Sequence, residues 1–268
     1  MDECNAEEIV YKFLQQFYSN IDYYIPDRYD EGYGVSKKGI EYAKSTGVSL
    51  IIILDCGIKA IEQIDYAKQL GIDFIICDHH VPDDVLPNAV AILNPKREDD
   101  TYPFKHLCGC GVGFKFMQGF ARSNGITFSQ LQPMLDLCAV SVAADLVPVE
   151  GENRILAYHG LRQLNQSPSV GLKAIIDVCG MTGRQITMSD ITFKIGPRIN
   201  ASGRMECGKE SVDLLVEKDY MKALKVSEQI NEYNEQRKDI DKQMTDEATT
   251  VVALLHDVVE DTEITFED

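Results

Sequence analysis

The sequence has no long apolar run, and this absence excludes a helical membrane protein. No stretch of its 268 residues approaches the roughly 20 consecutive apolar residues that span a bilayer. The opening segment, MDECNAEEIV, also lacks the basic and then apolar layout of a secretory signal. We therefore expect a cytoplasmic protein with no membrane partner.

The sequence also has no excess of basic over acidic residues. The chain has 26 lysines and arginines against 43 aspartates and glutamates, which gives a formal net charge of −17. This charge argues against a protein that wraps nucleic acid over a broad basic surface. Any contact with nucleic acid is therefore expected at a local basic groove.

The eight cysteines lack the paired CxxC pattern of a structural zinc site. The closest pair, Cys108 and Cys110, has CxC spacing, and we expect reduced thiols packed in the core rather than disulfides or zinc. Internal repeats and low-complexity tracts are absent too. The length fits one large domain, or one domain with a partial second.

Three short apolar runs, each ending in polar residues, indicate strands at 22–26, 49–57 and 73–80. Helix-like segments precede them at 7–19, 36–46 and 59–70. Because strands alternate with helices, the pattern predicts parallel βαβ units. The expected fold is therefore α/β, with a doubly wound, mainly parallel sheet flanked by helices.

Further helices are expected at 109–123, 130–149 and 154–166, with a turn before the last at 150–153. From about residue 207 the pattern changes to a long polar helix. Its apolar positions trace one narrow stripe: Val226, Ile230, Tyr233, Ile240 and Met244. Such a stripe is typical of a connecting helix that packs along a domain.

Acids and histidines follow the apolar runs. Asp55 closes the second expected strand, Asp78, His79 and His80 close the third, and Asp145 follows a later apolar run. Ligands collect at the carboxyl ends of parallel strands, and carboxylates with imidazoles suit manganese, zinc or iron, manganese being favoured where carboxylates dominate. Taken singly, each aspartate also fits a helix N-cap and the histidines fit ordinary hydrogen bonds. The coincidence of three sites favours a metal.

CDHHVP, at 77–82, resembles the signature of the DHH phosphoesterase superfamily. Other segments resemble its RecJ-like branch, the single-stranded-DNA-specific exonucleases, in order and spacing from about residue 9 to 245. These segments are YYIPDRYDEGYGVS (23–36), ILDCG (53–57), AILNPKR (91–97), AADLVPVEGENR (143–154) and IGPRINASGRM (195–205).

The resemblance implies two divalent ions, usually Mn²⁺ with Mg²⁺ as the other candidate. Asp55 would be the acid shared between the ions, and Asp78, His79 and Asp145 would complete the ligands. His80 would lie beside them as ligand, support or acid, so that Asp78 and His80 are the expected catalytic pair. Two ions about 3.5 to 4 Å apart activate a water and stabilise the oxyanion charge that develops on phosphorus.

The segment from Arg184 to Lys209 is locally basic, with five basic residues against two acids, a balance of +3. Arginine suits phosphate oxygens, and small residues let backbone amides approach the same anion. A tight turn is the other interpretation. The expected substrate contacts are Arg198, Asn200, Ser202, Gly203 and Arg204. The tyrosines of 23–33 either stack on bases or pack at a strand end.

The two ends of the sequence differ from the RecJ-like pattern. That pattern begins with a DxDxDG strand end, whereas this sequence begins MDECNAEEIVYKFL, so we expect at least one weakened metal site. Residues 254–262, LLHDVVEDT, resemble the HD motif of RelA/SpoT-type hydrolases, with His256, Asp257, Glu260 and Asp261 as its polar positions. The expected divisions are a DHH domain at 1–205, a connecting helix at 206–250 and an acidic tail at 251–268.

The function expected from these features is metal-dependent 5′ to 3′ exonuclease activity on single-stranded DNA, in DNA repair and recombination, with repair proteins as partners. Two alternatives remain open. One is a DHH phosphodiesterase that acts on short oligonucleotides or cyclic dinucleotides. The other is an inactive module that binds nucleic acid through its arginines.

Overall fold

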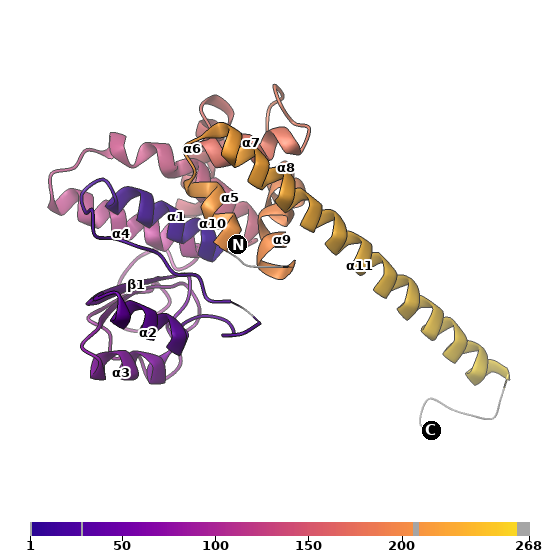
Figure 1. Ribbon diagram of the computed structural model, residues 1–268, viewed down its shortest axis with the longest axis horizontal. Helices are drawn as coiled ribbons and strands as arrows, with labels where there is room; N and C mark the ends of the chain where they lie inside the picture. The colour runs from indigo at the N-terminus through magenta and orange to yellow at the C-terminus, as the bar shows by residue number, and fades with distance from the viewer. Residues whose placement is uncertain (1, 28, 206–208, 262–268) are drawn as a thin grey trace.

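A computed structural model describes residues 2–27, 29–205 and 209–261, and the side chains of 6–27, 29–201 and 209–245. The sheet has three parallel strands in the order β1 (Leu50–Leu54), β2 (Asp73–Cys77) and β3 (Ala91–Leu93). Helices cover both of its faces, and a bundle of helices packs beside them (Figure 1). The expected α/β class with a parallel sheet is confirmed.

The elements follow one another along the chain in a simple order. Before the sheet lie α1 (Asp2–Leu14) and α2 (Lys37–Ser45), and α3 (Ile61–Gln69) connects β1 to β2. After β3 come α4 (Gly109–Ser123), η1 (Phe128–Gln130), η2 (Gln132–Met134), α5 (Leu135–Ala144), α6 (Gly151–Gln166), α7 (Val170–Val178), α8 (Met188–Asp190), η3 (Ile191–Ile195), α9 (Gly196–Met205), α10 (Lys209–Val216) and α11 (Tyr220–Asp261).

Two hydrophobic clusters hold the sheet from opposite sides. On one face, side chains such as Ile40 of α2 and Ile64 of α3 pack with Phe74 and Ile76 of β2. On the other face, α1 and α4 pack with Leu54 and Cys77 as part of a larger cluster. A sheet covered on both faces needs strands that are apolar almost throughout, which explains the runs LIIIL and FIIC.

Helix α5 is the centre of the helical part. Its residues 135–143 are all buried, because the sequence LDLCAVSVA has no polar face, and it packs chiefly against α6. Its single charged side chain, Asp136, accepts hydrogen bonds from the amides of Leu137 (2.8 Å) and Ser169 (2.8 Å). Burial raises the pKa of Asp136, and the two amides oppose that rise.

The expected strand at 22–26 is wrong. Residues 21–27 have no regular secondary structure and pair with no strand of the described chain, and a cavity of about 230 Å³ lies between them and the edge of β1. Tyr23 and Tyr24 instead donate hydroxyl hydrogen bonds, to Asp213 and to Glu31 (2.9 Å). Tyrosine and isoleucine favour a pleated surface, but a strand also requires a partner backbone.

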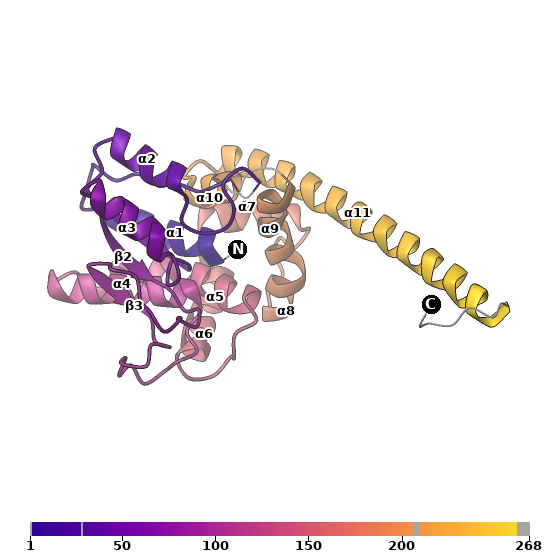
Figure 2. The same ribbon diagram turned by 90° about the horizontal axis from the view of Figure 1, so that it is seen from below.

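The connecting region also differs from one continuous helix beginning near residue 207. It consists of α10, a break at 217–219 and then α11, which leaves the body of the molecule in both perpendicular views (Figure 2). Asp219 marks the new start, because its carboxylate accepts hydrogen bonds from the amides of Met221 (2.8 Å) and Lys222 (3.2 Å). The side chains of the HD-like stretch lie outside the described residues.

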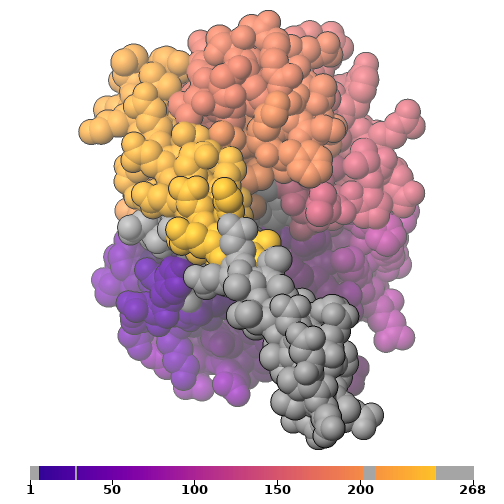
Figure 3. All heavy atoms as spheres, turned by 90° about the vertical axis from the view of Figure 1, so that its right-hand side faces the viewer, coloured from indigo at the N-terminus to yellow at the C-terminus, as the bar shows by residue number. Residues whose placement is uncertain are grey.

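None of the helices in the described part of the chain has both the length and the hydropathy of a bilayer-spanning segment. None of the cysteines whose side chains are described forms a disulfide: Cys56, Cys77, Cys108, Cys110, Cys138 and Cys179. Seen from the side of α11, α7 to α9 lie above the N-terminal part that carries the sheet (Figure 3).

Candidate metal centre

Asp55 and Asp78 lie on one rim because β1 and β2 end at the same level. Leu54 is paired with Cys77, and the next residue on each strand is the acid. The amide of Asp55 donates to the Cys77 carbonyl (2.8 Å), and the amide of Asp78 donates to the Leu93 carbonyl (3.0 Å). The sheet hydrogen bonds therefore continue up to both acids and set the positions of their backbones.

The backbone of Asp55 turns sharply as the strand ends. Its φ is 62°, in the left-handed region that aspartate tolerates better than most residues. The turn directs the carboxylate to the first residue of α4, where a Cβ added to Gly109 would lie only 1.9 Å from Asp55 Oδ1. Only glycine leaves room for this carboxylate, and the positive end of the α4 dipole favours its charge.

His79 is buried, and one ring nitrogen is committed to the backbone. Its Nδ1 lies 3.0 Å from the carbonyl oxygen of Leu107. A carbonyl only accepts, so Nδ1 carries the proton and, in the neutral ring, Nε2 keeps its lone pair. Nε2 lies 3.1 Å from Asp55 Oδ1 and 3.6 Å from Asp145 Oδ2. His79 Nε2 thus lies near one carboxylate oxygen from the end of β1 and another from the end of α5.

One carboxylate oxygen of Asp55 and one of Asp145 are unusual, because each is buried without a hydrogen-bond partner among the described residues. These oxygens are Asp55 Oδ1 and Asp145 Oδ2. Burial raises the pKa of Asp55, and the neighbouring His79 opposes that rise. Buried anionic oxygens require a counter-charge, which a bound cation supplies. Two carboxylates and an imidazole held by a backbone carbonyl fit a divalent cation.

Asp78 has a different environment from Asp55. Its Oδ2 accepts the amide of Ile58 (2.9 Å), and its Oδ1 accepts the amides of His79 (2.7 Å) and His80 (3.1 Å) as well as His80 Nδ1 (2.7 Å). Burial acts to raise the pKa of Asp78, but the hydrogen bonds from His80 and Ile58 outweigh it and lower the value. The structure thus shows Asp78 organising the turn; its role as a ligand stays a prediction.

His80 stands at the mouth of the cluster. Its side chain is 48% exposed, and its ring centroid lies 4.6 Å from that of His79. The hydrogen bond to Asp78 raises the pKa of His80. Ligand atoms of Asp55, His79 and His80 all lie within 4.8 Å of one another, so His80 is placed either to join a metal or to face its substrate.

Three contributors to this cluster were missed in the sequence. Leu107 supplies the carbonyl that fixes His79, and Gly109 supplies the space for Asp55. Asn94 follows β3, is buried, and donates from Nδ2 to the His80 carbonyl (2.9 Å). A polar residue that ends the apolar run AIL was a usable signal for Asn94. The other two act through backbone atoms and space, which side-chain chemistry does not reveal.

Asp145 reaches the cluster from a helix rather than a strand. It caps the C-terminus of α5, and the next residue, Leu146, has a left-handed φ of 54°. Leucine adopts this conformation with strain, which structures retain where the surrounding contacts enforce it. Thr192 of η3 holds the end of α5 by donating its hydroxyl to the Ala143 carbonyl (2.9 Å).

The segment 195–205 is helical rather than a tight turn or a loop of free amides. It begins α9 directly after the π-helical turn η3, so its backbone amides lie within a helix. Arg198 is held by neighbouring protein groups, and Asn200 has no hydrogen-bond partner among the described residues. Ser202, Gly203 and Arg204 have side chains outside the described residues, so their expected role stays a prediction.

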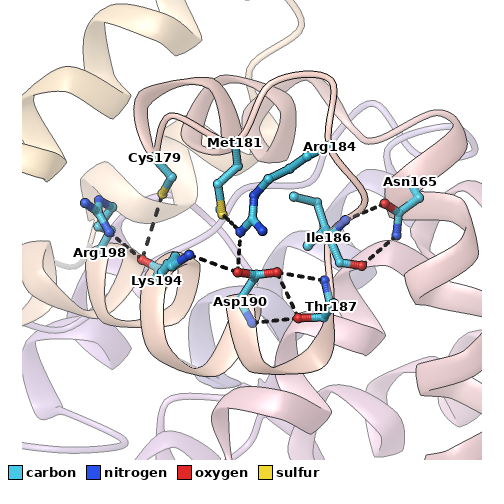
Figure 4. A network of polar contacts seen from close by, with 9 residues as sticks. All are labelled: Asn165, Cys179, Met181, Arg184, Ile186, Thr187, Asp190, Lys194 and Arg198. Atoms are coloured by element: carbon cyan, nitrogen blue, oxygen red, sulfur yellow. Dashed lines mark hydrogen bonds and ion pairs between the residues drawn. The ribbon is translucent and has the colours of Figure 1, made fainter.

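Just before this segment, Asp190 gathers two of the expected basic side chains (Figure 4). Arg184 donates to its Oδ1, and Lys194 Nζ lies 3.1 Å from the same oxygen. Thr187 donates its amide (3.1 Å) and hydroxyl (2.8 Å) to Oδ2, and its Oγ1 accepts the amide of Asp190 (3.2 Å), completing a capping box. Arg184 and Lys194 are therefore paired within the protein.

Asp55 and His79 of this cluster, and the turn built on Asp78 and His80, coincide with a sequence match, whereas Asp145 lies just beyond its end. A sequence model described as "DHH family, N-terminal domain" matches residues 1–142, more than half of the chain. The chain belongs to the DHH family. The resemblance inferred from CDHHVP is thereby confirmed, and Asp55, Asp78, His79 and His80 all fall inside the matched DHH segment.

Relatives of this DHH chain include the single-stranded-DNA-specific exonuclease RecJ of Bacillus subtilis (strain 168), 38% identical over 251 residues, which are 94% of this chain and 31% of the relative. RecJ of Escherichia coli (strain K12) is 36% identical over 243 residues, 87% of this chain and 42% of the relative. The chain thus spans less than half the length of each of these relatives.

A crystal structure of exonuclease RecJ bound to manganese is similar to this DHH chain with a TM-score of 0.82 and 27% identity, over 91% of this chain and 61% of that one. The structure of RecJ in complex with Mn²⁺ from Thermus thermophilus has the same fold, with a TM-score of 0.77 and 24% identity over 91% of this chain and 35% of that one.

Proposed function

We propose that this chain is the nuclease part of a RecJ-like enzyme that hydrolyses phosphodiester bonds of single-stranded DNA with divalent cations. The observation that carries the proposal is that His79 Nε2 lies near two buried oxygens, Asp55 Oδ1 and Asp145 Oδ2, that have no hydrogen-bond partner among the described residues. This arrangement stabilises a cation and is costly without a counter-charge.

Asp55, His79 and Asp145 would hold the ion, and Mn²⁺ is the first candidate, with Mg²⁺ second. A bound divalent cation supplies two things here: an activated water and compensation of the charge that develops on phosphorus. Two ions are expected by analogy with RecJ-like enzymes. The similar RecJ structures bound to manganese support the choice of metal.

The residues of this chain perform separate tasks in that proposal. Leu107 fixes the tautomer of His79, and Gly109 lets Asp55 reach the rim. Asp78 holds Nδ1 of His80, which leaves Nε2 on the half-exposed side of the ring. From there His80 can donate a proton to a leaving oxygen or accept one from a substrate. Asp78 is then a residue that orients the catalytic histidine.

The substrate assignment rests on the RecJ relatives, which are named as single-stranded-DNA-specific exonucleases. We propose the same substrate for this chain, with digestion from the 5′ end, a role in DNA repair and recombination, repair proteins as partners and a cytoplasmic location. The net charge of −17 fits a strand that is gripped locally rather than a duplex wrapped over a basic surface.

The test compares nucleotide release from 5′-phosphorylated single-stranded DNA by the parent chain, Asp55→Asn and Asp241→Asn, with and without Mn²⁺. Asp241 is an exposed acid on α11, far along the chain from the rim, and serves as the charge control. We expect Mn²⁺-dependent release by the parent and by Asp241→Asn, and none by Asp55→Asn.

Equal release by all three proteins would sink the assignment of the metal centre. A parent that cleaves only dinucleotides or cyclic dinucleotides would replace the DNA substrate with the small-molecule class. A parent that binds DNA without cleaving it in any divalent metal would leave the binding module as the function of this chain.

A further inference from the structure

The connecting helix α11 makes a specific polar contact with α9. Arg198 of α9 donates from Nε to Asn231 Oδ1 of α11 (2.8 Å) and from Nη1 to the carbonyl of Lys194 in η3 (2.9 Å). Its side chain is only 15% exposed. The guanidinium plane is therefore fixed by one side chain from α11 and one carbonyl from η3.

The π-helical turn explains why the Lys194 carbonyl is within reach. The amide of Gly196 donates to the Ile191 carbonyl, five residues back, and Pro197 has no amide hydrogen to give to the turn before it. This irregular hydrogen bonding turns the carbonyls around Lys194 away from a regular ladder. Arg198, four residues on, uses that carbonyl as an acceptor (Figure 4).

Most of the hydrogen-bonding capacity of Arg198 remains unused. A guanidinium has five N–H groups, and the two bonds above use one on Nε and one on Nη1. The nearest acid, Glu235 of α11, has its Oε1 3.9 Å from Nη2, which is too long for a hydrogen bond. Glu235 also accepts a hydrogen bond from Lys238 (2.9 Å), which lowers its pKa. Arg198 thus keeps free donors, and its long ion pair with the exposed Glu235 neutralises its charge only in part.

Asn231, the partner of Arg198 on α11, is neutral, and this neutrality determines whether the charge of Arg198 stays available. A carboxylate at position 231 would hold the guanidinium as well as an amide does, but it would also cancel its charge. An asparagine orients the group and leaves the charge available for an anion. Arg198 is also connected to the metal rim, because η3 carries Thr192, whose hydroxyl bonds the Ala143 carbonyl two residues before Asp145.

We propose that Asn231 is a positioning residue that presents the guanidinium of Arg198 to a phosphate of the bound strand, so that the connecting helix takes part in substrate recognition. This inference rests on the proposed function, since the phosphate is that of single-stranded DNA. It assigns to α11 a task beyond joining two parts of the enzyme.

The experiment measures binding of a 3′-fluorescein oligothymidylate by anisotropy as a function of NaCl, without divalent metal, for the parent, Asn231→Asp, Asn231→Ala and Gln229→Glu. Gln229 lies on the same helix and bonds Tyr233 and Glu210, so Gln229→Glu adds an equal charge without touching Arg198. Thermal unfolding of each variant is measured alongside.

We expect Asn231→Asp to keep the parent's melting temperature but to bind about tenfold more weakly, the value of one charge-assisted hydrogen bond. Its plot of log affinity against log salt should be shallower by about 0.7, the slope that one neutralised phosphate of a single strand contributes. Asn231→Ala should show the same shallower slope, and Gln229→Glu should keep the slope of the parent. A purely structural Asn231 predicts instead that Asn231→Asp binds like the parent.

A second measurement separates this inference from the proposed function. The Nε–H signal of Arg198 in a ¹⁵N spectrum should move on titration with inorganic phosphate in the parent, and much less in Asn231→Asp. If the parent does not bind the oligonucleotide, the proposed substrate fails, and the phosphate titration still decides the role of Asn231. If the Arg198 signal does not move on titration with phosphate, the inference is overturned.

Discussion

Asp55 and Asp190 are two buried carboxylates with opposite surroundings. Asp55 has one oxygen without a hydrogen-bond partner among the described residues, and burial raises its pKa. Asp190 is bonded by Thr187, Arg184 and Lys194, and these partners hold its pKa well below the ordinary range. Both lie beside a turn of irregular backbone, so irregular geometry alone does not distinguish them.

The difference shows how this chain separates function from stability. A carboxylate that serves the fold is given all the donors it needs, as in the Asp190 capping box. A carboxylate that serves a bound cation is left with an open oxygen in a buried place, at a cost to the free energy of folding. The unpaired oxygen of Asp55 is therefore better evidence of function than its burial or its position after a strand.

The largest expected effect concerns Asp55 Oδ1 and Asp145 Oδ2, the two buried oxygens that have no hydrogen-bond partner among the described residues. In the parent, Mn²⁺ at about 100 times its Kd should raise the free energy of unfolding by about 2.7 kcal/mol. In Asp55→Asn and in Asp145→Asn this increment should vanish, while the metal-free protein should be as stable as the parent or more so, because a buried unpaired charge is gone. Urea unfolding with and without Mn²⁺ measures both quantities. An undiminished response to Mn²⁺ would contradict the proposed ligands.

A somewhat smaller effect is expected when only the space around Asp55 changes. In Gly109→Ala the new Cβ would lie 1.9 Å from Asp55 Oδ1, so the carboxylate must move. We expect Mn²⁺ affinity to fall about 10- to 100-fold, the range for residues that orient a ligand. Calorimetric titration with Mn²⁺ measures the loss.

Gly119→Ala, on the exposed side of the same helix with no atom near the added Cβ, is the matched control. It should leave metal affinity unchanged and stabilise α4 by about 0.5 to 1 kcal/mol. Equal metal affinity in Gly109→Ala and Gly119→Ala would show that the contact with Gly109 does not position Asp55.

The smallest effect is expected on the structural side of the comparison. Asp190→Asn weakens the capping box and should lower the free energy of unfolding at pH 7 by about 0.5 to 2 kcal/mol, with metal affinity unchanged. The folded-state pKa of Asp190 lies below the ordinary 3.8, so its stabilisation is present above about pH 4 and is lost as the pH falls through the folded value. Urea unfolding from pH 6 to pH 3 should show the onset of this acid loss in the parent and less of it in the variant.

The sequence predicted those parts of the fold in which one pattern settles the answer. LIIIL and FIIC became β1 and β2, and the expected helix at 109–123 has the bounds of α4. The expected strand at 22–26 failed because strand formation depends on a partner backbone that local sequence does not specify. β3 escaped notice because its three residues are too short for any periodicity to show.

The sequence predicted which residue types form the candidate site, but it did not predict which role each of them has. Asp55 and His79 do come together, as the strand-end pattern indicated, and Asp145 joins them from the end of a helix. That pattern predicts the same role for Asp55 and Asp78, since both follow a buried strand. They differ because Asp78 faces the amides of Ile58, His79 and His80, whereas Asp55 faces a glycine that has no side chain to donate.

The basic segment shows a different limit. Its charge balance was correctly counted, but Arg184 and Lys194 pair with Asp190, which belongs to the same stretch. Counting charges does not tell which cations are already neutralised, because pairing depends on helix register and on the π-helical turn. Arg198 is distinguished from the other two only by its partner Asn231, thirty-three residues later.

The left-handed backbone of Asp55 restricts which replacements evolution can try at this position. Asparagine and glycine tolerate the conformation, and most other residues would strain the end of β1. The inexpensive substitutions are therefore ones that keep the fold and remove the charge. A change of Asp55 to asparagine or glycine should therefore remove the charge while the chain still folds.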